Sequence, residues 1–203
     1  MDDKAENYQL PADVTTSYTI SQASFDNVVI TVSDEASLIY TGKEQKPGIT
    51  VTLGGKTRKA NTDYTVSYAN NINATTDTSK ATVTITGTGN YKGTASAEFA
   101  IKTAALTVTP DNKTIKYGED KPTYTATYDG FVNRETKDTA GVFGGTLTFA
   151  CDYVNAGSAG NNKAGTYTIT PMGLTSANYE ITFKTGTLIV GRADRQVSIA
   201  CSI

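Results

Sequence analysis

The chain has 203 residues, a formal net charge of −2 and 38% hydrophobic residues, and it contains no histidine and no tryptophan. Binding to a nucleic-acid backbone requires clustered basic charge, and the lysines and arginines here are scattered, so nucleic acid is excluded as a partner. No apolar run is long enough to span a membrane. The polar start MDDKAENYQ lacks a signal-peptide pattern, and we interpret Met1 as an artificial start within a longer protein.

Apolar and polar residues alternate with a period of two along most of the chain, which predicts β-strands. β-branched and aromatic residues dominate the apolar side, as is typical of half-buried strands. The alternation is clearest at 64–68, 81–86, 123–128 and 166–170. Gly54 and Gly55 separate two strand-like runs and predict a two-residue hairpin turn. The pattern therefore predicts an all-β fold.

Residues 131–145 are the one segment that suggests a helix. Asn133 could serve as its N-cap, and glycines would end it after a turn or two. This candidate leaves a β-grasp-like arrangement with one short helix open for the surrounding module, beside a plain β-sandwich.

Three stretches of the chain follow one plan, at 6–23, 89–104 and 177–193. Each begins with Asn-Tyr, reaches an aromatic residue or leucine, has isoleucine or valine two places later, and closes in alanine. We interpret each as a final strand followed by a short linker, because divergent internal repeats of this kind indicate tandem modules. Each ending therefore predicts a domain boundary.

The boundaries divide the chain into four parts. Residues 1–23 would be the last strand of a preceding repeat plus a linker, 24–102 and 103–191 two complete modules, and 192–203 the first strand of a following repeat. The two modules also contain the same short series of residues: in each, a tyrosine, a glycine and a proline precede a strand. These residues are Tyr40, Gly42 and Pro47 in the first module, and Tyr117, Gly118 and Pro122 in the second.

We expect two β-sandwich-like modules in an elongated arrangement, each with its own core. Linkers as short as IKTAA at 101–105 are too brief and too poor in glycine to act as free coils. A single continuous core through residues 99–106 would argue against this division. The terminal strands near 7–20 and 195–203 would have unpaired edges, and such edges recruit partners.

The motifs of the two modules resemble two bacterial families. YTGK, DYTVSYANN and ATVTITGTGNYKGT, within about 25–102, resemble a bacterial immunoglobulin-like repeat. YGEDKPTYT, GFVNRET and SANYEITFKTGTLIV, within about 103–191, resemble the MBG repeat of bacterial surface and adhesin-like proteins. The resemblance implies extracellular or cell-surface tandem modules, and it carries no catalytic residue onto this chain.

The glycine-rich segment at 87–93 is not a nucleotide-binding motif. The spacing of Gly87, Gly89 and Gly93 departs from the dinucleotide fingerprint, and a strand follows where a helix is required. We interpret it as a hairpin turn. Without histidine the Ser-His-Asp arrangement and the common zinc sites are absent.

Two acidic pairs, Asp34-Glu35 and Glu119-Asp120, lie in polar, turn-like runs. Neighbouring residues of an extended chain point apart, so we interpret both pairs as solvated loop charge. Calcium ligands at 118–120 or 111–112 would lack the Asp-x-Asp-x-Asp-Gly spacing. We therefore assign no catalytic, cofactor-binding or metal-binding residue and no cofactor, and the sequence does not identify a ligand-binding residue.

Cys151 and Cys201 each lie on the apolar face of a strand-like run. We interpret them as core thiols, with a disulfide between them as the alternative. An internal Lys-Asn crosslink is a further alternative, but no motif selects a pair. Several tyrosines also fall on apolar faces, which favours core packing over a sugar-stacking platform. These are Tyr64, Tyr68, Tyr124, Tyr128 and Tyr167.

The sequence favours a non-catalytic spacer or stalk of a bacterial surface or secreted protein, with a role in adhesion. The alternatives are a glycan- or mucin-binding module and an accessory module of a larger extracellular enzyme. The partners expected are a host glycan or protein and the neighbouring repeats of the same chain.

Overall fold

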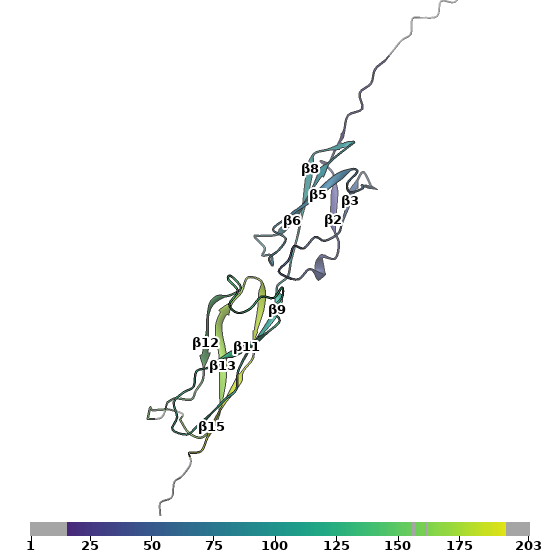
Figure 1. Ribbon diagram of the computed structural model, residues 1–203. Coiled ribbons are helices and arrows are strands. Elements are labelled where there is room, and N and C mark those ends of the chain that lie inside the picture. Colours follow the sequence, from purple (N-terminus) through teal and green to yellow (C-terminus); the bar gives the residue numbers. More distant parts are fainter. Residues whose placement is uncertain (1–15, 156, 161, 194–203) are drawn as a thin grey trace, which may run out of the picture.

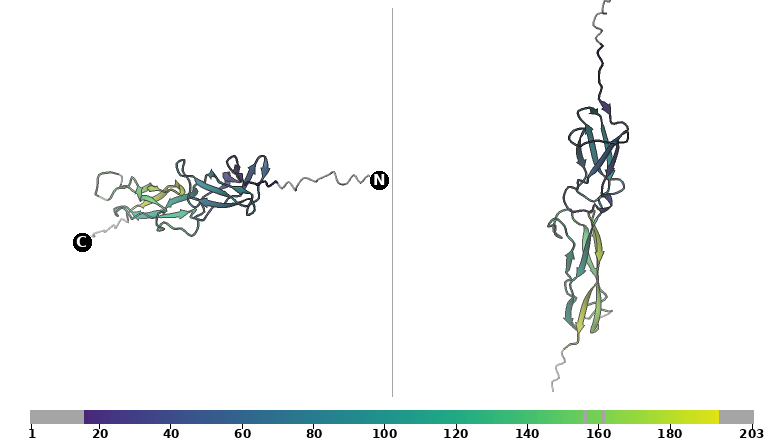
Figure 2. Two further views of the ribbon diagram at one scale, coloured as in Figure 1. Left: turned by 90° about the horizontal axis from the view of Figure 1, so that it is seen from above. Right: turned by 90° about the vertical axis from the view of Figure 1, so that its right-hand side faces the viewer.

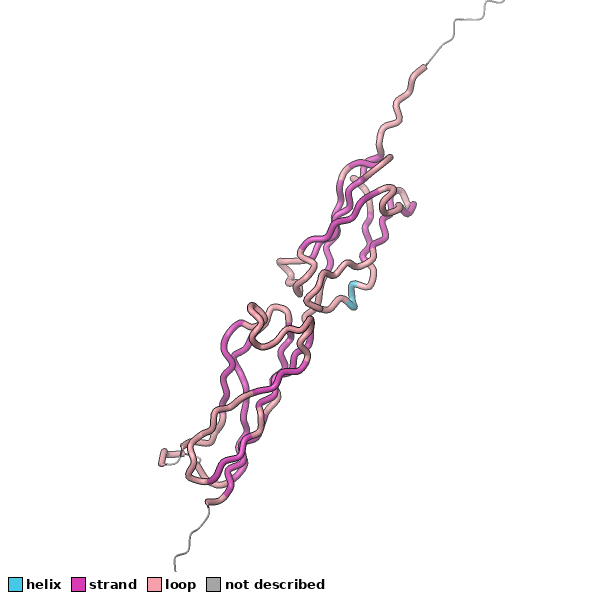
Figure 3. The backbone as a smooth tube through the Cα atoms, viewed as in Figure 1, coloured by secondary structure: helices cyan, strands magenta, loops and turns pink. Residues whose placement is uncertain are grey.

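The computed structural model describes residues 16–155, 157–160 and 162–193, and this part of the chain is all-β (Figures 1 and 3). The described residues contain a single helical turn, the 3₁₀ turn η2 (Glu35–Ser37). The fifteen strands of this described part fall into a first sheet group, β1 to β8, and a second sheet group, β9 to β15.

The first sheet group contains three short sheets. Their orders are β1-β7, β2-β3-β4 and β5-β6-β8. The strands are β1 (Ala23–Ser24), β2 (Val29–Val32), β3 (Ile49–Leu53), β4 (Lys56–Thr57), β5 (Tyr64–Ala69), β6 (Ala81–Gly87), β7 (Tyr91–Lys92) and β8 (Thr94–Phe99).

The second sheet group contains two sheets, in the orders β11-β9-β14 and β10-β15-β13-β12. The strands are β9 (Ala104–Pro110), β10 (Lys113–Lys116), β11 (Ala126–Asp129), β12 (Gly144–Ala150), β13 (Gly165–Thr175), β14 (Tyr179–Phe183) and β15 (Gly186–Gly191). The expectation of an all-β chain with sandwich-like modules is confirmed.

Each ladder among the described strands stays within one sheet group, and the two groups lie end to end (Figures 1 and 2). The chain passes from β8 to β9 at the waist of the molecule. Among the described strands, the ladders therefore change from the first sheet group to the second between β8 and β9.

The two groups share one pattern of connections. In the first group the entering strand β1 pairs in parallel with β7, so that Ala23 lies opposite Tyr91. In the second group the entering strand β9 pairs in parallel with β14, and Ala104 lies opposite Tyr179. The alanine that closes one ending of the sequence repeat therefore lies beside the Asn-Tyr that opens the next ending.

Buried side chains of the described residues form three clusters, and two of these each lie within one sheet group. The first group buries Phe25, Val51, Tyr64 and Ile85 together. The second group buries Ile115, Tyr153, Ile169, Leu188 and Val190. Except for Phe25 and Tyr153, which lie just outside the strands, these residues occupy the inward positions of strands, because successive side chains of a strand point to opposite faces.

The third cluster crosses the boundary. It joins Phe99 and Ile101 to Ala104 and Leu106, and each of the four is at most 5% exposed. The expectation of two wholly separate cores is therefore wrong, because buried packing is continuous through residues 99–106. The ladders divide the described chain into two groups, and side-chain packing couples them.

The expected helix within 131–145 is also wrong, because these residues form turns up to the start of β12. Asn133 and Arg134 have φ values of 51° and 62°. Two successive residues in the left-handed region cannot continue a right-handed helix. With no helix among its described residues, the second group also departs from a β-grasp arrangement.

The predicted hairpin turn at Gly54 and Gly55 is confirmed. Leu53 pairs with Lys56 across Gly54 and Gly55, whose φ values of 58° and 73° suit a two-residue hairpin turn. The predicted strand near 7–20 lies partly outside the described residues, and its described part, 16–20, is not assigned to a strand. The predicted strand near 195–203 lies wholly outside them.

Replacing Leu106 by alanine tests the continuous cluster. We expect Leu106→Ala to lower the free energy of unfolding by about 2–5 kcal/mol, because it opens a cavity in a packed interior. Amide hydrogen exchange should accelerate in β6 and β8 as well as in β9, since all three strands contribute to the cluster.

The matched control is Leu188→Ala, in the cluster confined to the second group. It should cost a similar free energy and leave exchange in β6 and β8 unchanged. Unchanged exchange in β6 and β8 of Leu106→Ala would contradict coupling between the groups.

Candidate functional site

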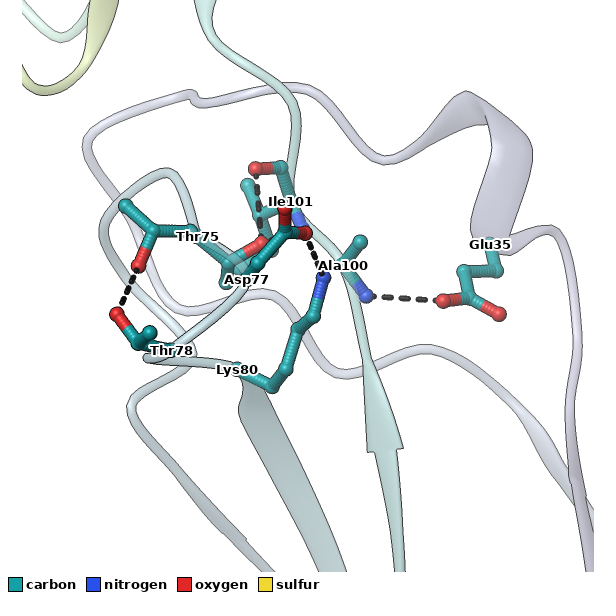
Figure 4. Close-up of polar contacts among 8 residues, drawn as sticks. Glu35, Thr75, Asp77, Thr78, Lys80, Ala100 and Ile101 are labelled. Atoms are coloured by element: carbon teal, nitrogen blue, oxygen red, sulfur yellow. Dashed lines mark hydrogen bonds and ion pairs between the residues drawn. The ribbon is translucent and has the colours of Figure 1, made fainter.

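The linker between the sheet groups is held by hydrogen bonds at successive residues (Figure 4). The Ala100 N–H donates to the Glu35 carboxylate at 2.9 Å, and the Ile101 N–H donates to the Thr75 hydroxyl at 3.0 Å. The Thr75 N–H in turn donates to the Ile101 carbonyl at 2.9 Å. The expectation that this linker is no free coil agrees with these contacts.

The bonding continues into the second group. The Lys102 N–H donates to the Leu38 carbonyl at 2.9 Å, and the Tyr40 N–H donates to the Lys102 carbonyl at 2.8 Å. The Ala104 N–H then donates to the Asn178 carbonyl, also at 2.9 Å. The chain therefore leaves one sheet group and enters the other within two residues.

A carboxylate joins the two groups through tyrosine hydroxyls. The Tyr40 hydroxyl of the first group donates to Glu135 Oε1 at 2.6 Å. The Tyr179 hydroxyl of the second group donates to Glu135 Oε2 at 2.5 Å, and it accepts a hydrogen bond from the Val132 N–H at 3.0 Å. Bonds from hydroxyls to a charged oxygen are stronger than neutral ones. We call Tyr40, Glu135 and Tyr179 the junction triad.

The tyrosine rings of the junction triad also pack directly. The rings of Tyr40 and Tyr179 meet edge to face, with centroids 5.5 Å apart, and Phe131 meets Tyr179 in the same geometry at 5.7 Å. Such aromatic pairs stabilise contacts beyond the area that they bury. Tyr40 and Tyr179 are 5% and 3% exposed, so the polar bonds of the triad lie at the edge of the continuous cluster.

Asparagines supply further contacts between the groups. The Asn133 side-chain amide donates to the Gly42 carbonyl at 3.0 Å. A Cβ added at Gly42 would lie 2.7 Å from the Asn133 Cβ, so the glycine permits this close approach. Asn178 accepts from the Ala74 N–H at 3.0 Å and donates to the Asn73 side chain at 3.2 Å.

Burial and the shared carboxylate change how the tyrosines of the triad titrate. Burial first, and then the hydrogen bond to Glu135, raise the pKa of Tyr179 to about 12. The same two causes, in the same order, raise the pKa of Tyr40 well above its usual value near 10. Both hydroxyls therefore stay protonated, and able to donate, across the neutral range.

A cleft of about 400 Å³ lies beside the junction triad. Tyr40, Glu135 and Asn178 line it, together with Asn73 of the first group. Its wall therefore comes from both sheet groups, and its shape depends on how they are joined.

One glutamate of each acidic pair accepts a hydrogen bond from a backbone amide. Glu35 holds the Ala100 amide, as above, and Glu119 accepts a hydrogen bond from the Lys116 N–H at 2.8 Å. Within the described residues, no three histidine, cysteine, aspartate or glutamate side chains gather into a metal-binding group. No helix of the described chain is long and apolar enough to cross a membrane.

The glycine-rich segment forms a connection between antiparallel strands, as predicted. The Gly87 N–H donates to the Gly93 carbonyl at 2.9 Å where β6 turns towards β8. Cys151 is a half-buried thiol that packs against the second group's own cluster. Cys201 lies outside the described residues, so the proposed disulfide stays a prediction.

The five tyrosines assigned to cores all pack against other apolar side chains. Tyr64 is buried, at 3% exposure, and the other four are half-buried beside aromatic or aliphatic neighbours. Tyr68 packs against the cluster that crosses the boundary, and Tyr124 and Tyr167 pack against the second group's own cluster. Tyr128 packs against the rings of Phe131 and Phe143.

Sequence reasoning did not identify Glu135, the residue that joins the two groups. The motif GFVNRET that contains it was noted as a family signature and as a helix candidate. The available signal was a charged residue between Phe131 and Phe143.

Comparison with known protein families gives one match, which lies in the second sheet group. Residues 106–189 match the family model described as MBG domain (YGX type). The match covers less than half of the chain and includes none of residues 25–102. Tyr117-Gly118-Glu119 lies inside the matched range. No curated protein and no solved structure matches the chain.

Replacing Glu135 by alanine tests the junction triad. We expect Glu135→Ala to lower the free energy of unfolding by roughly 1.5–3 kcal/mol, because two buried hydroxyls lose a charged acceptor. Exchange of the Ala104 amide should accelerate as the groups separate. Glu180→Ala is the control, since Glu180 is an exposed residue of the neighbouring strand β14. Equal effects of the two substitutions in chemical denaturation would contradict a role for the triad.

Alkaline pH should weaken the junction. The folded state raises the pKa of Tyr179 to about 12, so the folded state binds more protons than the unfolded state above pH 10. The stabilisation is therefore complete below pH 10 and is lost as pH rises from 10 to 12. The difference in unfolding free energy between the wild type and Tyr179→Phe should shrink across this range. A constant difference would contradict the assignment.

Proposed function

We propose that this chain is a non-catalytic spacer segment of a bacterial surface or secreted protein, in which the junction triad and the continuous cluster fix the angle between two modules. The observation that carries the proposal is the junction itself. A connection between domains is mobile by default unless its interface is large and apolar. Here the linker amides, a shared carboxylate and a buried cluster all oppose bending.

The extracellular setting rests on the MBG-type match of residues 106–189. The resemblance to MBG repeats implies tandem modules of a surface protein. A spacer built from such modules requires length and stiffness and no catalytic site. We extend the same role to residues 24–102, whose motifs resemble a bacterial immunoglobulin-like repeat. The shared strand connections of the two groups support treating both as modules of one repeating design.

The alternative of a glycan- or mucin-binding module needs an exposed aromatic platform. The packing of the predicted tyrosines inside clusters favours the spacer instead. An accessory role beside an enzyme domain is compatible with the same stiff junction. A role in adhesion would require a surface that binds a partner, and the spacer function does not depend on such a surface.

Distance measurements between the sheet groups test the proposal. Spin labels at exposed positions 65 and 168, in a background with both cysteines replaced by alanine, should give one narrow distance distribution. Inserting Gly-Gly-Ser-Gly between Thr103 and Ala104 should broaden it, because such linkers behave as flexible coils. Glu135→Ala should broaden it less than the insertion does. A wild-type distribution as broad as that of the insertion would contradict a stiff spacer.

A further inference from the structure

Tyr40 and Tyr117 occupy equivalent positions in the two sheet groups. The Tyr40 N–H donates to the Lys102 carbonyl and the Tyr117 N–H donates to the Gly191 carbonyl, both at 2.8 Å. In each case the residue before the tyrosine pairs in parallel with that same partner. The backbone therefore presents both tyrosines at the end of their group where the chain departs.

The alanines of the repeated ending are equivalent as well. The Ala23 N–H donates to the Asn90 carbonyl and the Ala104 N–H donates to the Asn178 carbonyl, both at 2.9 Å. Ala193 closes the third copy of the ending, two residues after Gly191, just as Ala104 stands two residues after Lys102. The chain thus shows twice how such an alanine is bound, in each case by the asparagine of an Asn-Tyr pair.

The surroundings of the two tyrosines differ. Tyr40 is 5% exposed and lies under the second sheet group, whereas Tyr117 is 48% exposed. Tyr117 borders a groove of about 710 Å³. We call the residues that line this groove the C-terminal pole: Tyr117, Lys163, Ala164, Arg192 and Ala193.

The glycines beside the two tyrosines differ in the same way. Gly42, two residues after Tyr40, lies against Asn133 of the second group. Gly118 directly follows Tyr117, and a Cβ added there would meet nothing within 4 Å. At its far end, the second group therefore offers a version of the junction surface that no other described residue covers.

We propose that the C-terminal pole binds the N-terminal end of another MBG-type module, one that carries an Asn-Tyr pair and an acidic loop residue as the second sheet group does. Ala193 then donates to the incoming asparagine carbonyl, and the Tyr117 hydroxyl donates to the incoming acidic residue. Lys163 and Arg192 border the groove, so its charge complements an acidic loop. This inference deepens the proposed spacer function and rests on it.

A tandem chain tests the proposal. Residues 1–193 are continued by a second copy of residues 105–193, so that Ala193 takes the place of Ala104. Exchange of the Ala193 amide should slow at least about tenfold relative to the unextended protein, which corresponds to roughly 1.4 kcal/mol of protection. Tyr117→Ala should reverse most of this slowing in the tandem chain. In the unextended protein it should leave the exchange of core amides unchanged.

The matched variant in the tandem chain replaces the glutamate of the appended copy that corresponds to Glu135. This replacement should accelerate Ala193 exchange as Tyr117→Ala does. Replacing the glutamate that corresponds to Glu180 should leave Ala193 exchange unchanged. Fast exchange of Ala193 beside protected β13 and β15 amides in the appended copy would overturn the proposal. If Ala104 stays protected in that chain, the spacer function stands and this inference alone fails.

A second variant tests the same idea without an appended copy. Thr103 and Arg192 occupy equivalent positions, so Thr103→Arg gives the existing junction the residue found at the C-terminal pole. Because Thr103 is exposed, Ala104 exchange should stay within about threefold of the wild type. Loss of Ala104 protection would show that an arginine at this position prevents docking, and would overturn the proposal.

Discussion

The carboxylate of Glu135 is the contact on which the arrangement of the two sheet groups depends. Glu135 is half-buried, so its carboxylate loses part of its hydration, and hydrogen bonds offset that loss. Here the offset comes from two tyrosine hydroxyls, one from each sheet group. Both bonds require Tyr40 and Tyr179 to reach the same carboxylate, so this one side chain constrains how the two groups are joined.

Backbone hydrogen bonds stabilise each sheet group, and side-chain contacts join the two groups. The ladders define each group, since each pairing among the described strands lies within one of them. The continuous cluster and the junction triad then join two bodies whose backbones meet at the linker. A joint made from side chains can be loosened by single substitutions that leave both sets of sheets intact. A joint made by a shared strand could not be separated from the fold in this way.

The sequence predicted the strands well because their alternation is local and repeated. It also predicted the hairpin at Gly54 and Gly55, whose turn chemistry is carried by the two residues themselves. The segment 131–145 was predicted wrongly, because Asn133 can cap a helix and can equally adopt a left-handed conformation. Tertiary contact with Gly42 favours the second conformation, and no local pattern contains that contact.

The continuous cluster escaped prediction for a related reason. Alternation shows that Phe99 and Leu106 face inward, but it does not show that the two interiors meet. That depends on the linker, whose amides are bound at successive residues, so that the ends of the groups come within side-chain reach. The junction triad was likewise invisible, since its residues lie 95 and 44 positions apart along the chain.

The repeated ending has a physical meaning that differs from the one first drawn from it. Read along the chain, Asn-Tyr opens an ending and alanine closes it, which marks a boundary. In space, the alanine that closes one ending pairs with the Asn-Tyr that opens the next. The repeated ending therefore encodes a contact inside each sheet group, between the alanine of its entering strand and the Asn-Tyr of a later strand. Alanine suits its half because a larger side chain at Ala104, which is 5% exposed within the cluster, would have to displace packed neighbours.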